Sequence, residues 1–461
     1  MKKFCLFFWA VTVVSGFGCE ENNGGEDIVD NISPQVESVT PSDGETGVSL
    51  NSKIVITYSE PITLGNSHQI AVNNKTVDVS VNENQLNIET VLENNTDYSV
   101  TISAISVLDL AKNYAEEFSF SFSTKTNNPI EISAELVTKN PSKEAENVYN
   151  FLKENYGQKV ISASMSNVAW NINEAEWIKQ HTGKYPAIAS FDYIHLPFSP
   201  ANWIDYSETA FIEEWWNNNG LVCASWHWNV PSNQGSDNYY FYADETSFKA
   251  SNATIEGTWE NEIVKADLEK ISSYIKILKE KNIPLIWRPL HEAAGNIYEY
   301  QAGEAWFWWG ANGAEAFKQL WIYMFNYFRE MELDNLIWVW TTQTNDNDFY
   351  PGDNYVDIIG RDVYNNSDAN SIAEQFSSIR NEYPNKIVTL SEMGNVATIS
   401  SQWAAGAKWA YFMPWYDFER TNNLNEADFN QPAHQFANAD WWIDAVNQSY
   451  VITRDQMPNL K

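Results

Sequence analysis

The sequence predicts an α/β protein in which a small all-β sandwich precedes a (β/α)8 barrel of the TIM type. The chain has 461 residues, which exceeds the size that one hydrophobic core usually supports and so favours two domains. Residues 34–126 contain no tryptophan and consist of short alternating segments separated by turns. The following region holds 20 of the 21 tryptophans and alternates eight short apolar runs with helical stretches.

The first 18 residues have the pattern of a secretory signal. Lys2 and Lys3 precede an apolar run from Phe4 to Val14, and small residues then lead to Cys19. The run is too short to span a bilayer comfortably. The tail from Gly16 to Cys19 resembles the lipobox of bacterial lipoproteins, and the acidic residues after it resemble the export tag of surface lipoproteins in Bacteroidetes-type bacteria. This resemblance implies a lipid on Cys19 and the outer membrane as location, at the cell surface or on the periplasmic side.

Residues 19–33 are rich in Asn, Gly, Asp and Glu and predict a flexible tether. Residues 34–126 then alternate apolar and polar positions, as in Lys53 to Tyr58 and Tyr98 to Ile102, which predicts a β-sandwich. The string PSDGETGVSLNSKIVITYSEPI resembles bacterial immunoglobulin-like modules. Such a domain serves as a spacer or as a binding module, and the lack of an aromatic platform favours the spacer.

Residues 136–461 carry the barrel pattern, whose typical length is about 250 residues before loop insertions. The eight predicted strands are Lys159 to Met165, Pro186 to Tyr193, Leu221 to Trp228, Ile283 to Glu292, Asn335 to Thr342, Val356 to Tyr364, Lys386 to Glu392 and Ala407 to Trp415. Apolar residues spaced 4, 3, 4 and 3 apart from Val264 to Leu278 predict one of the intervening helices, and Ala314 to Glu330 another.

In such a barrel the functional residues lie at the C-terminal ends of the strands. Two glutamates, Glu292 and Glu392, end the fourth and seventh predicted strands. A retaining glycosidase needs one carboxyl group to protonate the leaving oxygen and a second to attack the anomeric carbon. Taken singly, each glutamate could instead cap a helix or pair with an arginine, but two at matching strand ends favour catalysis.

Two motifs around these glutamates resemble glycoside hydrolase family 26, which is best known for β-mannanases. WRPLHEAAGN followed by AWFWWG resembles the family's acid/base segment, and LSEMGN resembles its nucleophile segment. The resemblance covers residues 136–461. It implies an endo-β-1,4-mannanase that acts with retention on mannan, galactomannan or glucomannan. Mixed-linkage β-glucan, β-1,3-xylan and a non-catalytic glycan-binding role remain open alternatives.

The resemblance also implies roles for single residues. It makes Glu292 the general acid/base and Glu392 the nucleophile. His291 and His227 would hydrogen-bond the sugars near the cleaved bond, and Tyr364 would hydrogen-bond the nucleophile.

Three further residues are candidates by their chemistry. Arg288 could orient Glu392 through a charge-assisted fork or support the barrel rim. Trp306 and Trp415 are candidate sugar-stacking platforms. The segment NIYEYQAGEA, between Gly295 and Trp306, is longer than the family's usual connection and leaves the role of Trp306 open.

Charge and composition exclude other functions. A formal net charge of −33 opposes binding to nucleic acid. The six histidines include no His-x-x-x-His pair, so neither a metal nor another cofactor is expected. Removal of the signal leaves Cys19 and the apolar-flanked Cys223, which predicts no internal disulfide. The expected partners are β-mannan polysaccharides or manno-oligosaccharides and, through the lipid, a membrane; a monomer is expected.

Overall fold

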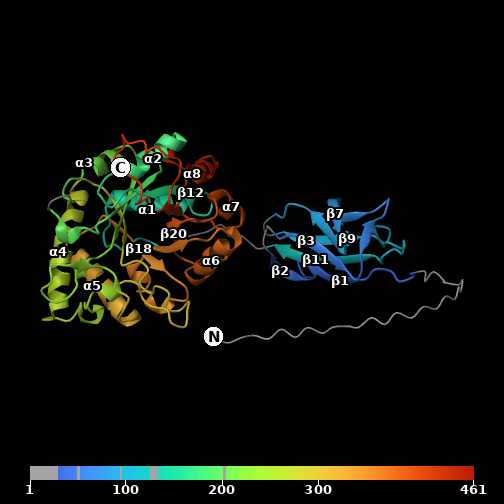
Figure 1. Cartoon of the computed structure of the whole chain (residues 1–461), viewed down its shortest axis with the longest axis horizontal. Helices are drawn as coiled ribbons and strands as arrows, with labels where there is room; N and C mark the ends of the chain where they lie inside the picture. The colour runs from blue at the N-terminus through green and yellow to red at the C-terminus, as the bar shows by residue number, and fades with distance from the viewer. Residues whose placement is uncertain (1–29, 49–51, 94–95, 125–131, 133, 201–203) are drawn as a thin grey trace, which may run out of the picture. The chain divides into compact units, whose positions relative to one another are not determined.

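The computed structural model describes residues 30–48, 52–93, 96–124, 132, 134–200 and 204–461. The described residues up to Thr124 form one compact unit, and those from Ala134 onward form a second (Figure 1). The predicted signal, Cys19 and most of the tether lie outside the described residues, as does most of the segment between the two predicted domains. Within the described ranges, no helix is long and apolar enough to cross a membrane.

The first unit contains two antiparallel sheets with one parallel pairing, as predicted for a sandwich. The four-stranded sheet has the order β1 (Val36–Thr40), β3 (Ile54–Tyr58), β8 (Gln85–Glu89) and β7 (Asp78–Asn82). The five-stranded sheet has the order β2 (Glu45–Val48), β11 (Phe118–Thr124), β9 (Asp97–Ile102), β5 (Ile70–Val72) and β6 (Lys75–Thr76). A further pair joins β4 (Ile62–Leu64) to β10 (Val107–Asp109).

The core of this unit is formed by apolar residues at alternate positions of its strands. Along β3, Ile54, Ile56 and Tyr58 are buried while the residues between them are half-buried. Successive strand residues point to opposite faces, so a period of two directs one set of side chains inward. The predicted all-β domain is confirmed.

The second unit is a closed parallel barrel of eight strands, which confirms the predicted fold class. Its strands are β12 (Val160–Met165), β13 (Ile188–Asp192), β14 (Leu221–Trp226), β17 (Leu285–Pro289), β18 (Leu336–Thr342), β19 (Ile358–Tyr364), β20 (Ile387–Gly394) and β21 (Tyr411–Pro414). Pairing of β12 with both β13 and β21 closes the ring. The short β22 (Val451–Ile452) also pairs with β12.

Helices surround this ring (Figure 1). They are α1 (Lys143–Asn155), α2 (Asn173–Thr182), α3 (Ala210–Asn217), α4 (Trp259–Glu280), α5 (Ala314–Glu330), α6 (Ala369–Glu382), α7 (Ile399–Ala404) and α8 (Ala439–Val446). In α4 the predicted apolar stripe is buried, and Thr258 caps the first turn by accepting from the Asn261 N–H. Between β18 and β19 the chain instead forms the 3-10 turns η4 (Asn347–Phe349) and η5 (Asp353–Tyr355).

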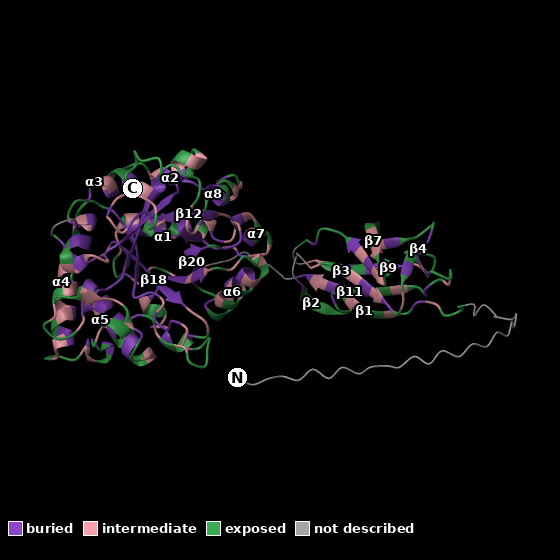
Figure 2. Cartoon of the chain, viewed as in Figure 1, coloured by how far each residue is buried: buried purple, intermediate pink, exposed green. Residues whose placement is uncertain are grey.

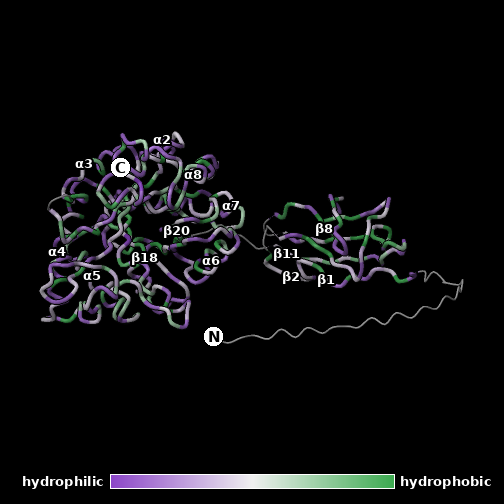
Figure 3. The backbone as a smooth tube through the Cα atoms, viewed as in Figure 1, coloured by the Kyte–Doolittle hydropathy of each residue, from purple (hydrophilic) through white to green (hydrophobic). Residues whose placement is uncertain are grey.

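The barrel strands are buried along almost their whole length, as the purple strands of Figure 2 show. The same strands are mostly apolar, with polar segments concentrated in the surrounding loops (Figure 3). Twelve tryptophans are fully buried, and all twelve belong to this unit. Long connections follow the C-terminal ends of β14, β17 and β21, and they cover residues 227–258, 290–313 and 415–438. These loops build the mouth of the barrel.

Candidate active site

Glu392 lies within β20, two residues before the end of the strand, and is held from two sides. Arg288 Nη1 donates to its Oε2 at 2.9 Å, and the Tyr364 hydroxyl donates to its Oε1 at 2.6 Å. Burial and the nearby carboxylates raise the pKa of Tyr364 well above its ordinary value, so the phenol keeps the proton that it donates. The two donors fix the orientation of the carboxylate.

Arg288, on β17, bonds to residues of three other strands of the barrel, β18, β19 and β20. Its side chain is completely buried, and it donates from Nη2 to Asp362 and from Nε to Thr341 Oγ1 at 3.1 Å. Burial raises the pKa of Asp362 to about 7, although the charge of Arg288 opposes this shift. Asp362 also accepts from Ser391 Oγ at 2.7 Å. An arginine in this position keeps a positive charge beneath Glu392 at any working pH.

A bulge in β20 produces this arrangement. Arg361 pairs with Leu390 but Asp362 pairs with Glu392, so Ser391 is an extra residue on one strand. An extra residue changes which face the following side chains occupy. The neighbouring Gly360 leaves room for it, because a Cβ there would lie 2.4 Å from Ser391 Oγ.

Glu292 lies in a turn beyond β17, since the strand ends at Pro289 and not at Glu292 as the sequence predicted. Leu290 and Glu292 both have φ of 50°, a left-handed conformation that costs a non-glycine residue about 1–3 kcal/mol and is concentrated at functional sites. Burial raises the pKa of Glu292 well above its ordinary value, and the charges of Asp362 and Glu392 add to the shift. Glu292 is therefore suited to keep a proton at a pH where an exposed glutamate would have lost it.

Two histidines lie against each other beside these carboxylates. His227 Nδ1 is 2.5 Å from Asp192 Oδ2, and its Nε2 is 3.1 Å from His291 Nε2. Burial lowers the pKa of His291 well below its ordinary value, and the charges of Arg288 and His227 act in the same direction. His291 is therefore neutral. Asp192, at the end of β13, fixes the Nδ1 proton of His227 and was missed in the sequence, where it was only one of 61 acidic residues.

Aromatic rings line the mouth next to the histidines. Trp415 lies 5.7 Å from His227 between ring centroids, and Phe307 lies 5.3 Å from His291. Tyr242 stacks on Phe307 at 5.7 Å, and its pKa is raised by burial and by nearby carboxylates that include Glu292 and Glu392. Tyr242 and Phe307 were not predicted, because a single aromatic residue in a long loop has no periodic pattern.

Trp306 directly precedes Phe307 on the loop that follows β17. Its side chain is exposed, and its backbone carbonyl accepts from the Ala243 N–H at 2.8 Å. Trp308 and Trp309 are completely buried and donate to backbone carbonyls of Trp228 and His291. They are packing residues, whereas Trp306 presents its ring to solvent.

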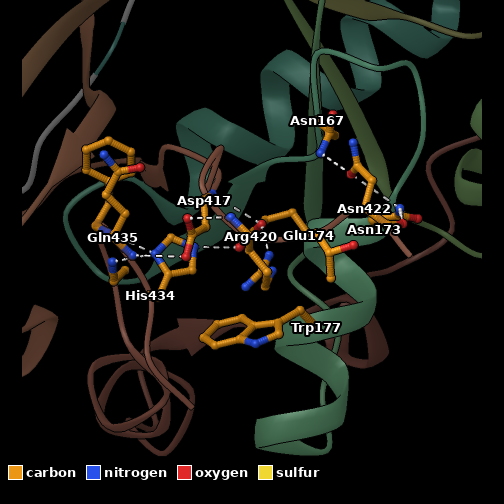
Figure 4. Close-up of polar contacts among 12 residues, drawn as sticks. Asn167, Asn173, Glu174, Trp177, Asp417, Arg420, Asn422, His434 and Gln435 are labelled. Carbon is orange, nitrogen blue, oxygen red and sulfur yellow. Dashed lines mark hydrogen bonds and ion pairs between the residues drawn. The ribbon is translucent and has the colours of Figure 1, made fainter. Parts of the chain in front are cut away.

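A polar cluster fixes the 415–438 loop (Figure 4). Glu174, in the first turn of α2, is buried and accepts from Arg420 and from His434 Nε2, the latter at 2.7 Å. Figure 4 shows both side chains pointing toward Glu174, with Trp177 beside them. His434 Nδ1 accepts from the N–H groups of Phe436 and Ala437, both at 2.9 Å. No local sequence pattern indicates this cluster, because Arg420 and His434 lie 246 and 260 positions from Glu174.

The same loop packs against the side of the mouth that holds Glu392. The ring of Phe436 lies 5.7 Å from that of Tyr364, and its carbonyl accepts from the Asn395 N–H at 2.8 Å. A Cβ on Gly394 would meet both rings at less than 3 Å. A chain of contacts thus runs from Glu174 through His434 and Phe436 to Tyr364.

Among the predicted residues, the structure thus brings Arg288, Tyr364 and Glu392 into direct contact and pairs His227 with His291. Glu292 lies within the electrostatic field of Arg288 and Glu392. Trp415 lies beside His227, and Trp306 stands at the outer part of the mouth. Cys19 lies outside the described residues.

Two family models match the chain. The model of glycosyl hydrolase family 26 matches residues 137–447, and that of a bacterial Ig-like domain matches residues 30–124. Among curated proteins, mannan endo-1,4-beta-mannosidase A of a Piromyces species is 34% identical over 326 residues, which are 67% of this chain and 48% of that protein. A mannan endo-1,4-beta-mannosidase of Thermothelomyces thermophilus is 30% identical over 69% of this chain and 62% of that protein. The chain spans about half the length of the first of these relatives.

Two solved structures of mannanases are also similar to this chain. The family 26 domain of an endo-beta-mannanase/endo-beta-glucanase from Prevotella bryantii is 38% identical, with a TM-score of 0.64, over 70% of this chain and 98% of that one. A beta-mannanase from a symbiotic protist of the termite Reticulitermes speratus, complexed with gluco-manno-oligosaccharide, is 32% identical, with a TM-score of 0.60, over 72% of this chain and 100% of that one.

Proposed function

Because the chain belongs to glycosyl hydrolase family 26, we propose that it is an endo-β-1,4-mannanase that cleaves mannan, galactomannan or glucomannan with retention of configuration. The observation that carries the proposal is the contrast between two carboxyl groups at one barrel mouth. Glu392 accepts from Arg288 and Tyr364, which suits a nucleophile, while the pKa of Glu292 is raised, which suits a proton donor.

In the first step Glu392 attacks the anomeric carbon and Glu292 gives its proton to the departing glycosidic oxygen. Arg288 and Tyr364 keep Glu392 oriented toward the anomeric carbon until it forms the ester. Glu292, now a carboxylate, then takes a proton from water, and that water displaces Glu392 from the same face that the leaving sugar occupied. Two inversions leave the configuration unchanged.

The pair of imidazole rings has a binding role in this scheme. Asp192 holds His227 by Nδ1, so the facing Nε2 atoms of His227 and His291 are left to bind each other or sugar hydroxyls. Trp415 and Trp306 offer ring faces to the C–H groups of pyranose rings. These contacts would align the glycan with the two carboxyl groups.

Reducing-end release from galactomannan, glucomannan, mixed-linkage β-glucan and β-1,3-xylan tests the substrate. Release from the mannans that disappears in Glu392→Ala supports the proposal. Release from β-glucan or β-1,3-xylan alone would reassign the substrate within the family. Binding of glycans without any release would favour a non-catalytic capture protein.

The proposed location is the outer membrane, with the protein facing the cell exterior as a monomer anchored by a lipid on Cys19. The lysines, apolar run and small residues before Cys19 support this location, although all of them lie outside the described residues. Metabolic labelling with a fatty acid, followed by membrane fractionation, tests it against Cys19→Ser. The expected result is a labelled membrane protein that becomes unlabelled and leaves the membrane fraction in the variant.

A further inference from the structure

Three exposed aromatic side chains follow the general acid/base on a single loop. Tyr298, Tyr300 and Trp306 are 40%, 60% and 38% exposed. They belong to or adjoin residues 296–305, the segment that lengthens the connection between Glu292 and the tryptophan cluster. Large exposed aromatic residues grouped on one loop are unusual unless they bind something.

The loop is internally bonded, so its aromatic residues are held in place. Asn296 accepts with its Oδ1 from the Glu304 N–H at 2.8 Å, and the Asn296 N–H donates to the Glu304 carbonyl at 3.1 Å. A Cβ on Gly303 would lie 1.9 Å from the Asn296 carbonyl oxygen, so the two ends of the loop pack without space between them. This closure gives a compact Ω-like loop.

Tyr298 is also anchored from outside the loop. Its hydroxyl donates to Asp348, and its ring lies 6.3 Å from that of Phe349 in an edge-on arrangement. Both partners belong to the connection after β18. A ring held at two points loses little freedom when a ligand stacks on it, which favours binding.

The loop lies next to the proposed proton donor, Glu292. Glu292 protonates the leaving oxygen, so the leaving sugars lie along the protein surface next to Glu292. Residues 296–305 follow Glu292 directly in the chain. The Gly295 N–H donates to the Glu292 carbonyl at 2.9 Å, and a Cβ on Gly295 would lie 2.4 Å from the Glu304 carbonyl oxygen, so both ends of the loop lie close to Glu292 in space as well as in sequence.

The charges around these rings suit a neutral ligand. Glu299, Glu304 and Asp348 are exposed and surround the tyrosines in the sequence and in space. Such a surface repels sulfated or uronic-acid glycans and leaves neutral sugars with aromatic faces on which to stack.

We propose that Tyr298 and Tyr300 form a distal leaving-group subsite, which binds a neutral β-glycan chain at the second or third sugar beyond the cleaved bond. This inference rests on the proposed function, because it needs a glycan cleaved at Glu292. The subsite makes the enzyme prefer long substrates and selects which internal bond is cut.

Manno-oligosaccharides of three to six sugars test the subsite in the full chain without its signal. The variant Tyr298→Ala/Tyr300→Ala is compared with wild type by the ratio of kcat/KM for the hexaose to that for the triose. Two lost stacking contacts are expected to lower this ratio about tenfold. Tyr298→Phe keeps the ring and loses the hydroxyl, and it is expected to keep most of the ratio. Tyr114→Ala, an exposed tyrosine of the first unit, is the matched control and is expected to leave it unchanged.

Hydrolysis of mannopentaose in H2(18)O measures a second property, the position of the cleaved bond, independently of the rate. The oxygen of water enters the new reducing end, so the labelled fragment is the one that was bound to Glu392. Loss of a leaving-group subsite should move cleavage toward the reducing end, so that shorter fragments leave.

An unchanged ratio and an unchanged cleavage position in an active double variant would overturn the subsite, as would a shift of cleavage toward the non-reducing end. If wild type releases nothing from any mannan, the proposed function itself fails. The two failures are therefore distinguishable.

Discussion

The two sides of the barrel mouth each hold one glutamate, Glu392 or Glu292, in opposite electrostatic surroundings. On one side, Glu392 lies inside a strand and accepts from a buried guanidinium and a phenol. On the other, Glu292 lies in a left-handed turn, and burial and like charges raise its pKa. The comparison teaches that the surroundings, and not the residue type, distinguish the two carboxyl groups: fixed donors orient Glu392, whereas burial raises the pKa of Glu292.

The surroundings extend this contrast beyond the carboxylates. The nucleophile side is polar and cross-linked, with Arg288 reaching Asp362 and Thr341. The acid/base side is built from aromatic rings and from His291, whose pKa is lowered. Fixed donors hold a carboxyl group in place on the first side, and burial favours a neutral acid on the second.

Removal of either carboxylate should have the largest effect on activity, and the two variants should differ in the way the two sides of the mouth differ. Glu392→Ala is expected to lower kcat by about 10⁴-fold or more, because no group remains to form the covalent ester. Glu292→Ala should cost about 10²–10⁴-fold on mannan, and much less on an aryl mannoside whose leaving group needs no proton. Added azide should give a product of retained configuration with Glu292→Ala and of inverted configuration with Glu392→Ala. NMR of the products reads the configuration, and the reverse assignment would exchange the two roles.

Loss of Arg288 should damage both stability and activity. Arg288→Met leaves Asp362 and Glu392 buried without a cation, which is expected to lower the free energy of unfolding by about 3–5 kcal/mol. Urea denaturation measures this change. The double variant Arg288→Met/Asp362→Asn removes one of the stranded charges and should recover part of the stability but not the activity. If the single variant were as stable as wild type, the buried pairs would not hold the barrel mouth together.

Removal of the tyrosine hydroxyl tests the nucleophile side more gently. Tyr364→Phe keeps the ring against Phe436 and deletes the 2.6 Å hydrogen bond to Glu392. A hydrogen bond to a charged group contributes about 1.5–3 kcal/mol, so kcat is expected to fall about 10- to 100-fold with little change in stability. Steady-state kinetics on a soluble mannan measures the fall. Tyr185→Phe, which removes a hydroxyl bonded to Glu176 on α2, is the control.

The pH profile of activity tests the proposed proton-donor role of Glu292. Activity needs protonated Glu292, so the rate falls as pH rises through the pKa of Glu292. Asp362 is one of the charges that raise this pKa. In Asp362→Asn the lost negative charge favours ionised Glu292, and the alkaline limb of kcat/KM should move to lower pH. Asp267→Asn, whose carboxylate accepts from Trp228 away from the site, should leave the limb in place.

Periodic patterns explain how much of the fold could be predicted. The helix expected over Ala314 to Glu330 has those bounds in the structure, and each predicted barrel strand overlaps one of the eight observed strands. A buried strand or an amphipathic helix repeats its pattern every few residues, so it can be recognised locally. The fourth strand was drawn too long because the apolar run continues through Leu290, where a left-handed turn already redirects the chain.

The contacts of the site were less predictable, because they join residues far apart in the chain. Glu292 and Glu392 could be selected by their strand-end positions and by a family resemblance. Asp362 is 74 residues from Arg288, and no local pattern indicates that they form an ion pair. A charged pair, Arg361 and Asp362, within an otherwise apolar strand was the one available signal, since buried charges require partners. Glu174 had no such signal.

The smallest expected effect on activity comes from Glu174, whose side chain holds the 415–438 loop at the barrel mouth. Glu174→Gln weakens the pairing with Arg420 and His434, so the loop that carries Trp415 and Phe436 should become more mobile. KM is expected to rise about three- to tenfold while kcat changes about twofold or less, because the loop positions the glycan and does not react with it.

Hydrogen exchange identifies the cause of that change. Faster exchange confined to amides of residues 417–437 would show that the cluster holds the loop, and Glu176→Gln on the same helix should leave these amides unaffected. A fall in kcat at constant KM would instead mean that the loop acts through Phe436 on Tyr364. In that case the cluster would belong to the nucleophile side, and the polar cross-linking of that side would extend from Arg288 to α2.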